Sequence, residues 1–268
     1  MKAILALEDG RTFDCRSFTG PGETRGEVVF NTSMTGYQEV LTDPSYRGQM
    51  VAMTYPLVGN YGINPEDIES DRIQVSAFLL REYQAFASNF RATASLADYL
   101  KAQNILGVDQ LDTRALTRHI RNAGAMRACI STLDRNPESL VRRARQTPAM
   151  AGRDLAAAVT TDRPFFWTDG GVRPCSEDLA AAGRSVFSRN TRPFSVVAFD
   201  IGVKYNILRC LAQAGCKVLV VPAKTPAENV KDLAPVGIFL STGPGDPEPV
   251  TYAIDTIRRL LNFRPIFG

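Results

Sequence analysis

Histidine is nearly absent from this chain of 268 residues, which contains only His119. His119 falls in a predicted helix, where a solvent-facing or partly buried position is expected. Cysteine is sparse as well, and no Cys-x-x-Cys pair occurs among the five residues, Cys15, Cys129, Cys175, Cys210 and Cys216. An odd number at irregular spacing favours neither a disulfide framework nor a zinc site. We therefore expect reduced, buried thiols and no metal site.

Long apolar runs and a large net charge are also missing. No stretch approaches the roughly 18 uninterrupted apolar residues that a membrane span needs. The first apolar run meets charge at Glu8 and Asp9, which is too early for a signal peptide. The net charge of +3 is too small to indicate a nucleic acid or an anionic membrane as a partner. A cytoplasmic protein that binds neither nucleic acid nor membrane is expected.

Residues 1–150 predict a domain of the α+β class. Short apolar segments bounded by Gly, Pro and Asp predict four strands, at Ala3–Leu7, Glu27–Phe30, Met50–Tyr55 and Ile73–Leu80. Three helices are predicted after them: Ser95–Gln103 with a serine N-cap, Asp112–Ala123 closed by Gly124, and one that opens with Pro137 after Asn136. Strands grouped early and helices grouped late are typical of α+β domains.

The second half changes character. Residues 151–192 predict a linker or covering segment, because glycine and proline recur and periodicity fades. The apolar cluster Phe165-Phe166-Trp167 is expected to pack this segment onto a domain. Over residues 193–268, apolar strands alternate with short helices, which is typical of a doubly wound parallel sheet of the flavodoxin-like kind.

The pattern stops at Pro265-Ile266-Phe267-Gly268, in the first half of what looks like a further strand. We therefore expect this second domain to be incomplete and less stable than the first. Apolar positions that such a sheet would leave short of cover include Val197, Phe239, Ile266 and Phe267.

The loop Ser241–Pro247 lies after a predicted strand and before a predicted helix. Ligands bind at the carboxyl ends of strands in parallel sheets, so function is expected here. Gly243 and Gly245 leave backbone N–H groups free to face an oxyanion or a small polar substrate. A plain strand-to-helix turn is the alternative. The loop matches neither of the glycine-rich fingerprints for phosphate binding.

Two sets of motifs resemble known families. The run Phe239–Pro247, followed by Arg264-Pro265-Ile266-Phe267-Gly268, resembles the class I (triad) glutamine amidotransferases. The run Gly26–Tyr46 (GEVVFNTSMTGYQEVLTDPSY) resembles the small subunit of carbamoyl-phosphate synthetase. Other segments with the same resemblance are Thr54–Pro56, Ala87–Arg91, Asp112–Arg118 and Phe199–Arg209. The resemblance covers essentially the whole chain.

The resemblance implies a subunit that hydrolyses glutamine through a cysteine thioester and contacts glutamine from both domains. Ser45 matches a serine whose hydroxyl contacts glutamine. Gly243 and Gly245 match glycines whose backbone contacts glutamine and stabilises the oxyanion. Thr242 replaces an asparagine that is common in the family. The family's partner is a large subunit, which uses ATP and Mg²⁺ to make carbamoyl phosphate for arginine and pyrimidine synthesis. No cofactor is implied for the small subunit itself.

The family's nucleophile would follow Gly268, since the matching strand continues there into Ile-Cys-Leu-Gly-His-Gln. The catalytic Cys, His and Glu therefore match nothing in this chain, and His119 falls in the wrong domain to serve as the base. We expect the 268-residue chain to be inactive as a glutaminase. Arg114, Arg118 and Arg121 predict a solvated helix face, or more weakly a surface that meets the large subunit.

Three hypotheses remain open at this point. The chain is expected to be a fragment of a glutamine-hydrolysing small subunit. The first alternative is a non-catalytic subunit that only binds the large subunit and leaves free ammonia as the nitrogen source. The second is an unrelated flavodoxin-like binder of a small ligand, against which the missing phosphate-binding glycines argue.

Overall fold

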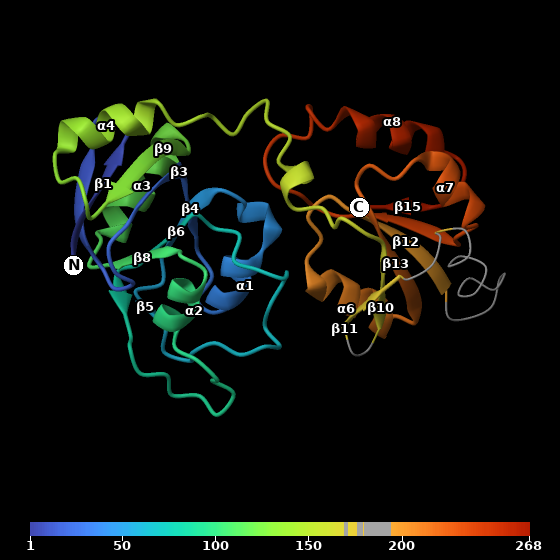
Figure 1. The fold of residues 1–268 in the computed structure, drawn as a ribbon, viewed down its shortest axis with the longest axis horizontal. Coiled ribbons are helices and arrows are strands. Elements are labelled where there is room, and N and C mark those ends of the chain that lie inside the picture. Colours follow the sequence, from blue (N-terminus) through green and yellow to red (C-terminus); the bar gives the residue numbers. More distant parts are fainter. Residues whose placement is uncertain (169–170, 176–178, 180–193) are drawn as a thin grey trace. The chain divides into compact units, whose positions relative to one another are not determined.

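The computed structural model describes residues 1–168, 171–175, 179 and 194–268. The chain forms two compact units, Met1–Met150 and Ala151–Gly268. Each unit is built around its own apolar clusters. Figure 1 colours the first unit from blue to green and the second from yellow to red.

Seven strands of the first unit close into a barrel in the order β1-β2-β8-β6-β4-β3-β9. They are β1 (Lys2–Leu7), β2 (Thr12–Ser17), β3 (Glu23–Asn31), β4 (Gln49–Met53), β6 (Ala77–Leu79), β8 (Leu106–Asp109) and β9 (Met126–Ser131). The pairs β3–β4, β4–β6 and β6–β8 are parallel, and the other pairs of neighbouring strands in the barrel are antiparallel. The plain α+β prediction is therefore corrected, because antiparallel pairing of β1 with β9 closes the sheet.

Three helices of the first unit begin where the sequence predicts a cap, and two short ones, α1 (Tyr37–Thr42) and the 3-10 helix η1 (Pro44–Tyr46), were not predicted. The three are α2 (Leu96–Ala102), α3 (Thr113–Ala123) and α4 (Pro137–Arg145). The side chains of Ser95, Asp112 and Asn136 each accept a hydrogen bond from a first-turn backbone N–H, which confirms the three predicted helix starts. Gly124 ends α3 at φ 93°, a conformation that favours glycine. Two short strands, β5 (Leu57–Val58) and β7 (Glu82–Tyr83), pair in parallel outside the barrel.

The barrel strands β1, β4 and β6 are mostly apolar and buried on both faces. Successive side chains on a strand point to opposite faces, so Leu5 and Leu7 of β1 join one core cluster with Leu116 of α3. Ala6, between them, faces the other way and packs against Leu140 of α4. Burial on both faces explains why β1, β4 and β6 read as nearly continuous apolar runs. β2 differs, because its buried residues alternate with exposed polar ones.

The second unit is a six-stranded sheet in the order β11-β10-β13-β12-β14-β15. Its strands are β10 (Phe165–Thr168), β11 (Gly171–Pro174), β12 (Phe194–Asp200), β13 (Cys216–Pro222), β14 (Gly237–Leu240) and β15 (Ile266–Phe267). The last four pair in parallel, as predicted. β10 and β11 are antiparallel additions, so the sheet is mixed, and the predicted wholly parallel sheet is corrected. The cluster Phe165-Phe166-Trp167 packs as predicted, as a strand of this sheet.

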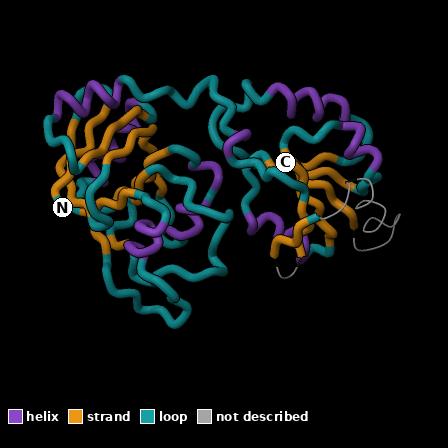
Figure 2. Tube along the Cα trace, viewed as in Figure 1, coloured by secondary structure: helices purple, strands orange, loops and turns teal. Residues whose placement is uncertain are grey.

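Helices cover both faces of this sheet, as a doubly wound arrangement requires. α6 (Tyr205–Gln213) packs on one face with the cluster around Ala198 and Phe239. α7 (Ala227–Asp232) and the end of α8 (Thr251–Leu260) pack on the other face with the cluster around Val197 and Leu219. A short 3-10 helix, η2 (Ala156–Ala158), precedes β10. In Figure 2 the strands of this sheet run as neighbouring orange tubes between purple helices.

The prediction that four apolar positions would lack cover is partly wrong. Val197 is fully buried and Phe239 is 6% exposed, because helices already cover both faces of the central strands. Ile266 is partly buried. Only Phe267, on the edge strand β15, has a largely bare side chain, at 72% exposure. Within the described residues, no helix has both the length and the apolar character that crossing a membrane requires.

We expect the Leu219→Ala substitution to lower the free energy of unfolding of the second unit by about 2–5 kcal/mol, because Leu219 is fully buried in β13. Trp167, the single tryptophan, lies in β10, which pairs with β13. Its fluorescence in a urea titration therefore reports on this unit alone. The matched control is Leu261→Ala, at a leucine that is 58% exposed. Its effect should stay within about 0.5 kcal/mol, and equal effects of the two variants would contradict this description of the core.

Candidate functional site

The glycine loop of the second unit follows β14 at the carboxyl end of the parallel sheet. β14 pairs with β12, and Leu240 lies opposite Phe199. The two strands therefore end side by side, and the loops that follow them meet. The buried Ser241 hydroxyl accepts a hydrogen bond from Ile201 N at 2.9 Å and donates one to Thr242 O at 2.8 Å. This hydroxyl joins the loop after β14 to the loop after β12.

Gly243 and Gly245 are both exposed to solvent, and each has a reason to be glycine. A Cβ at Gly243 would collide with the carbonyl oxygen of Ile201. Gly245 has a φ of +71°, and a Cβ there would lie 2.9 Å from Leu155 Cδ1. The loop thus combines an open outer side with close packing beneath it, so its backbone N–H groups are accessible while its path is constrained.

Gly268 lies next to this loop. β15 pairs in parallel with β14, and a Cβ at Gly268 would lie 3.2 Å from the Cβ and the carbonyl oxygen of Leu240. The end of β15 therefore reaches the same sheet edge as the glycine loop.

Ser45 lies in the first unit, in η1, directly after α1. Asp43 is the N-cap of η1, and its carboxylate accepts a hydrogen bond from Ser45 N at 2.9 Å. The Ser45 side chain is partly buried. Its hydroxyl makes no hydrogen bond to another residue in the described part of the chain, which leaves the hydroxyl available to a ligand.

The residues just before Ser45 are held by a second loop. Thr42, at the end of α1, is fully buried, and its hydroxyl donates to Gln38 O at 2.9 Å. The same hydroxyl accepts a hydrogen bond from Glu69 N at 2.9 Å, and Ser70 Oγ donates to Thr42 O at 2.6 Å. The position of Ser45 therefore depends on the segment that contains Glu69 and Ser70.

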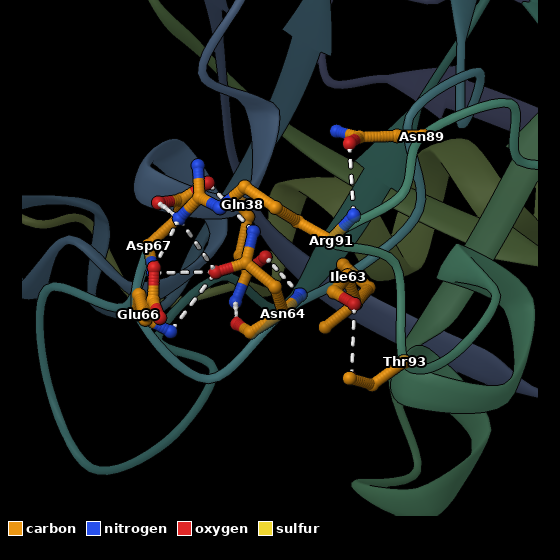
Figure 3. Close-up of polar contacts among 8 residues, drawn as sticks. All are labelled: Gln38, Ile63, Asn64, Glu66, Asp67, Asn89, Arg91 and Thr93. Carbon is orange, nitrogen blue, oxygen red and sulfur yellow. Dashed lines mark hydrogen bonds and ion pairs between the residues drawn. The ribbon is translucent and has the colours of Figure 1, made fainter.

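A polar network around Asn64 holds the loop that leads to this segment, as Figure 3 shows. The fully buried Gln38 side chain bonds both backbone groups of Asn64: Nε2 donates to Asn64 O at 2.5 Å, and Oε1 accepts from Asn64 N at 2.9 Å. The Asn64 side chain in turn accepts from Glu66 N and Asp67 N at 2.9 and 3.0 Å, and donates to Asp67 Oδ2 at 2.7 Å. Gln38 thus ties α1 to the loop that leads to Glu69 and Ser70.

Arg91 closes the network from a third loop. Its Nη2 donates to Glu66 Oε2 and to Asp67 Oδ1, both at 2.7 Å, and lies 3.3 Å from Asn64 Oδ1. The motif segments Gly26–Tyr46 and Ala87–Arg91 therefore meet at Asn64. We did not single out Asn64 or Arg91 as site residues from the sequence, although the Ala87–Arg91 motif contains the arginine.

Glu39 is the residue of this region whose ionised carboxyl is disfavoured by its surroundings. Burial raises the pKa of the Glu39 carboxyl, the charges of Asp67 and Glu69 raise it further, and Arg91 opposes the rise. Its Oε2 atom is buried and accepts no hydrogen bond from the described residues. The charge of Arg91 therefore favours the ionised form of Glu39, which gives Arg91 an electrostatic role as well as a structural one.

His119 is a partly buried helix residue, as predicted. Its Nε2 lies 2.6 Å from Asp9 Oδ2, and its Nδ1 lies 3.2 Å from Arg11 Nη1. Burial alone would raise the pKa of Asp9, but hydrogen bonds from Arg11 N and His119 together lower it. Both ring nitrogens of His119 are therefore engaged by Asp9 and Arg11 of the first unit. The predicted solvated face of α3 is confirmed, because Arg114, Arg118 and Arg121 are all exposed.

The cysteines show no activated thiol where the structure resolves a pKa change. Burial raises the pKa of Cys15 to about 12 and that of Cys129 to about 11, and it also raises the pKa of Cys216. The prediction that all thiols are buried is wrong for Cys210, which is exposed on α6, and Cys175 and Cys216 are only partly buried. In the described part of the chain, no group of three or more His, Cys, Asp or Glu side chains could hold a metal ion.

Comparison with known proteins gives two family matches. The model of the carbamoyl-phosphate synthase small chain, CPSase domain, matches residues 5–130, and that of class I glutamine amidotransferases matches residues 196–268. The carbamoyl phosphate synthase small chain of Syntrophotalea carbinolica is 54% identical over 268 residues, which are 100% of this chain and 69% of that protein. The protein of that name from Nitratidesulfovibrio vulgaris strain Hildenborough is 50% identical over 100% of this chain and 70% of its own length. The one from Thermosynechococcus vestitus is 51% identical over 99% and 68%.

We expect the Gln38→Ala substitution to speed amide hydrogen exchange at Asn64 by about tenfold or more. The variant removes both partners of Asn64's backbone groups, and a buried backbone group left unpaired costs about 1–3 kcal/mol. Gln49→Ala is the matched control, because that side chain donates to Glu27 Oε2 and does not touch the network. Unchanged exchange at Asn64 in the Gln38 variant would show that the amide does not hold the loop.

Proposed function

This chain belongs to the carbamoyl phosphate synthase small-chain family, and from that premise we propose that it handles glutamine for such a synthase. In the proposed reaction a cysteine thiolate attacks the side-chain amide of glutamine, ammonia leaves, and water releases glutamate from the γ-glutamyl thioester. Ammonia then passes to the large subunit, which uses bicarbonate, ATP and Mg²⁺ to make carbamoyl phosphate. The carbamoyl phosphate serves arginine and pyrimidine synthesis.

The observation that carries this proposal is the glycine loop after β14. Gly243 and Gly245 are exposed, lack a Cβ and follow the carboxyl end of a parallel strand. Backbone N–H groups in such a loop can donate to glutamine and to the oxyanion of the tetrahedral intermediate. The negative charge develops on that oxygen only during reaction, so donors held in place beforehand lower the barrier. The constrained path of the loop supports this role.

Ser45 contributes a glutamine contact from the first unit in this proposal. Its hydroxyl has no other partner in the described part of the chain, and its backbone is held by Asp43. A hydroxyl can both donate and accept, so it suits a substrate that carries an ammonium and a carboxylate as well as an amide.

In this proposal the nucleophile of the chemical step is not one of these 268 residues. A catalytic cysteine requires a thiolate and a nearby base. Burial raises the pKa of Cys15, Cys129 and Cys216. His119, which lies in α3, is engaged with Asp9. We propose that the nucleophile follows Gly268; the pairing of β15 with β14 supports this, because it brings the end of β15 to the edge where the glycine loop lies.

We expect the purified 268-residue polypeptide to release no ammonia from glutamine above a blank without protein. The positive control is a completed chain, in which residues 1–268 are followed by the remaining part of the Syntrophotalea carbinolica small chain. It is co-expressed with the large chain of that organism and should release ammonia in a coupled assay. Ammonia from the 268-residue polypeptide would place the nucleophile within it, and a silent completed chain would argue against the proposed function.

In the completed chain, we expect the Ser45→Ala substitution to raise KM for glutamine by roughly tenfold with little change in kcat. A lost hydrogen bond to a charged group costs about 1.5 kcal/mol, which is close to a factor of ten. An interaction equally strong in the ground and transition states affects KM alone. Ser33→Ala is the control, at an exposed serine of the same unit. An unchanged KM would remove Ser45 from the binding site.

A further inference from the structure

The two glycines of the loop rest on different neighbours. A Cβ at Gly243 would collide with the Ile201 carbonyl and lie 2.9 Å from Ile201 Cγ2. A Cβ at Gly245 would lie 2.9 Å from Leu155 Cδ1. Ile201 follows β12, and Leu155 precedes η2. The path of the loop therefore depends on two segments that are 46 residues apart in the sequence.

Asp200 holds the first of these segments. It is the last residue of β12, and its side chain is almost fully buried. Its Oδ1 accepts hydrogen bonds from Gly202 N at 3.0 Å and from Val203 N at 2.8 Å. These bonds fold the chain into a turn with Ile201 inside it, and Gly202 adopts a φ of 128° there. The carbonyl that Gly243 touches is thus set by Asp200 Oδ1.

The other carboxylate oxygen holds the second segment. Asp200 Oδ2 accepts a hydrogen bond from Thr161 N at 2.7 Å, and Thr161 closes the stretch that contains Leu155 and η2. Thr160 Oγ1 accepts from Ala223 N at 2.9 Å, which docks the same stretch onto the end of β13. Hydrogen bonds to an ionised carboxylate are stronger than neutral ones, so Asp200 supplies the firmest polar contact of this stretch.

We infer that Asp200 is a positioning residue for the Gly243–Gly245 loop, because its two oxygens hold the two segments on which the glycines rest. Leu155 transmits one of these contacts to Gly245. This inference rests on the proposed function, in which the loop's N–H groups face the oxyanion. In this inference Asp200 acts through the backbone of the loop, by setting the directions in which those N–H groups point.

The Asp200→Asn substitution can distinguish the role of Oδ1 from the role of Oδ2. The asparagine carbonyl can keep the bonds from Gly202 and Val203, but its NH₂ group then faces the Thr161 N–H, and two donors cannot bond. The stretch that contains Leu155 should be released while the turn around Ile201 stays closed. Leu155→Ala removes the contact with Gly245 by a different route and leaves Asp200 intact.

The first measurement is the ¹H–¹⁵N spectrum of the 268-residue protein. In Asp200→Asn, the cross-peaks of Thr161 and Gly245 should shift, whereas those of Gly202 and Val203 should stay near their original positions. The matched control is Asp255→Asn on α8, where the carboxylate is exposed and pairs with Arg258. A Gly245 cross-peak that does not move in Asp200→Asn overturns the inference.

The second measurement is a double-mutant cycle on glutaminase activity in the completed chain. Asp200→Asn and Leu155→Ala should each lower kcat by roughly tenfold or more and change KM less, because an oxyanion donor acts only in the transition state. The double variant should be little worse than either single variant, since both release the same contact. Leu261→Ala is the control for Leu155→Ala. An unchanged kcat in either single variant, or fully additive losses, overturns the inference.

Failure of the proposed function is distinct from these outcomes. If the unsubstituted completed chain releases no ammonia, the proposed function fails, and the spectra alone decide whether Asp200 positions the loop. If Asp200→Asn does not fold, Leu155→Ala must still shift the Gly245 cross-peak and lower kcat, and its failure to do so overturns the inference.

Discussion

Parallel pairing of β12 with β14 is the constraint on which the second unit's site depends. The register that sets Phe199 opposite Leu240 makes the two strands end together. β12 ends at Asp200, whose side chain bonds its own turn, and β14 is followed at once by Ser241, whose side chain bonds the other loop. A shift of the register by one residue would turn the apolar side chains of β14 to the opposite face. Core packing and the geometry of the glycine loop are therefore fixed by one pairing.

In the first unit, the position of Ser45 is also fixed by bonds between neighbouring segments. Ser45 lies after a helix of only six residues, α1, which is too short to be stable alone. Its position is set by Gln38, Thr42 and the loop that Asn64 and Arg91 organise. In both units a buried polar side chain bonds the backbone of a neighbouring loop. Such a group is costly unless all its bonds are made, so each loop is held in one conformation.

Local features of the fold could be predicted from the sequence, and non-local ones could not. Ser95, Asp112 and Asn136 cap their helices through bonds to residues two or three positions away, so a short window contains all the information. Closure of the barrel depends on β1 meeting β9, more than a hundred residues later, and no local pattern encodes that register. The strand β10 was missed because Phe165–Thr168 is short and apolar, which fits a covering segment as well as a strand.

The same distinction separates the residues of the candidate site. Gly243 and Gly245 are conspicuous because two glycines around a proline at the end of a strand demand an explanation. Asp200 and Leu155 carry no such signal. Asp200 looks like an ordinary residue at the end of a strand, and its importance comes from bonds to Thr161, on a stretch that the sequence pattern leaves unstructured. Residues that touch a substrate leave local marks in a sequence, while residues that position them are found only where the folded chain brings distant segments together.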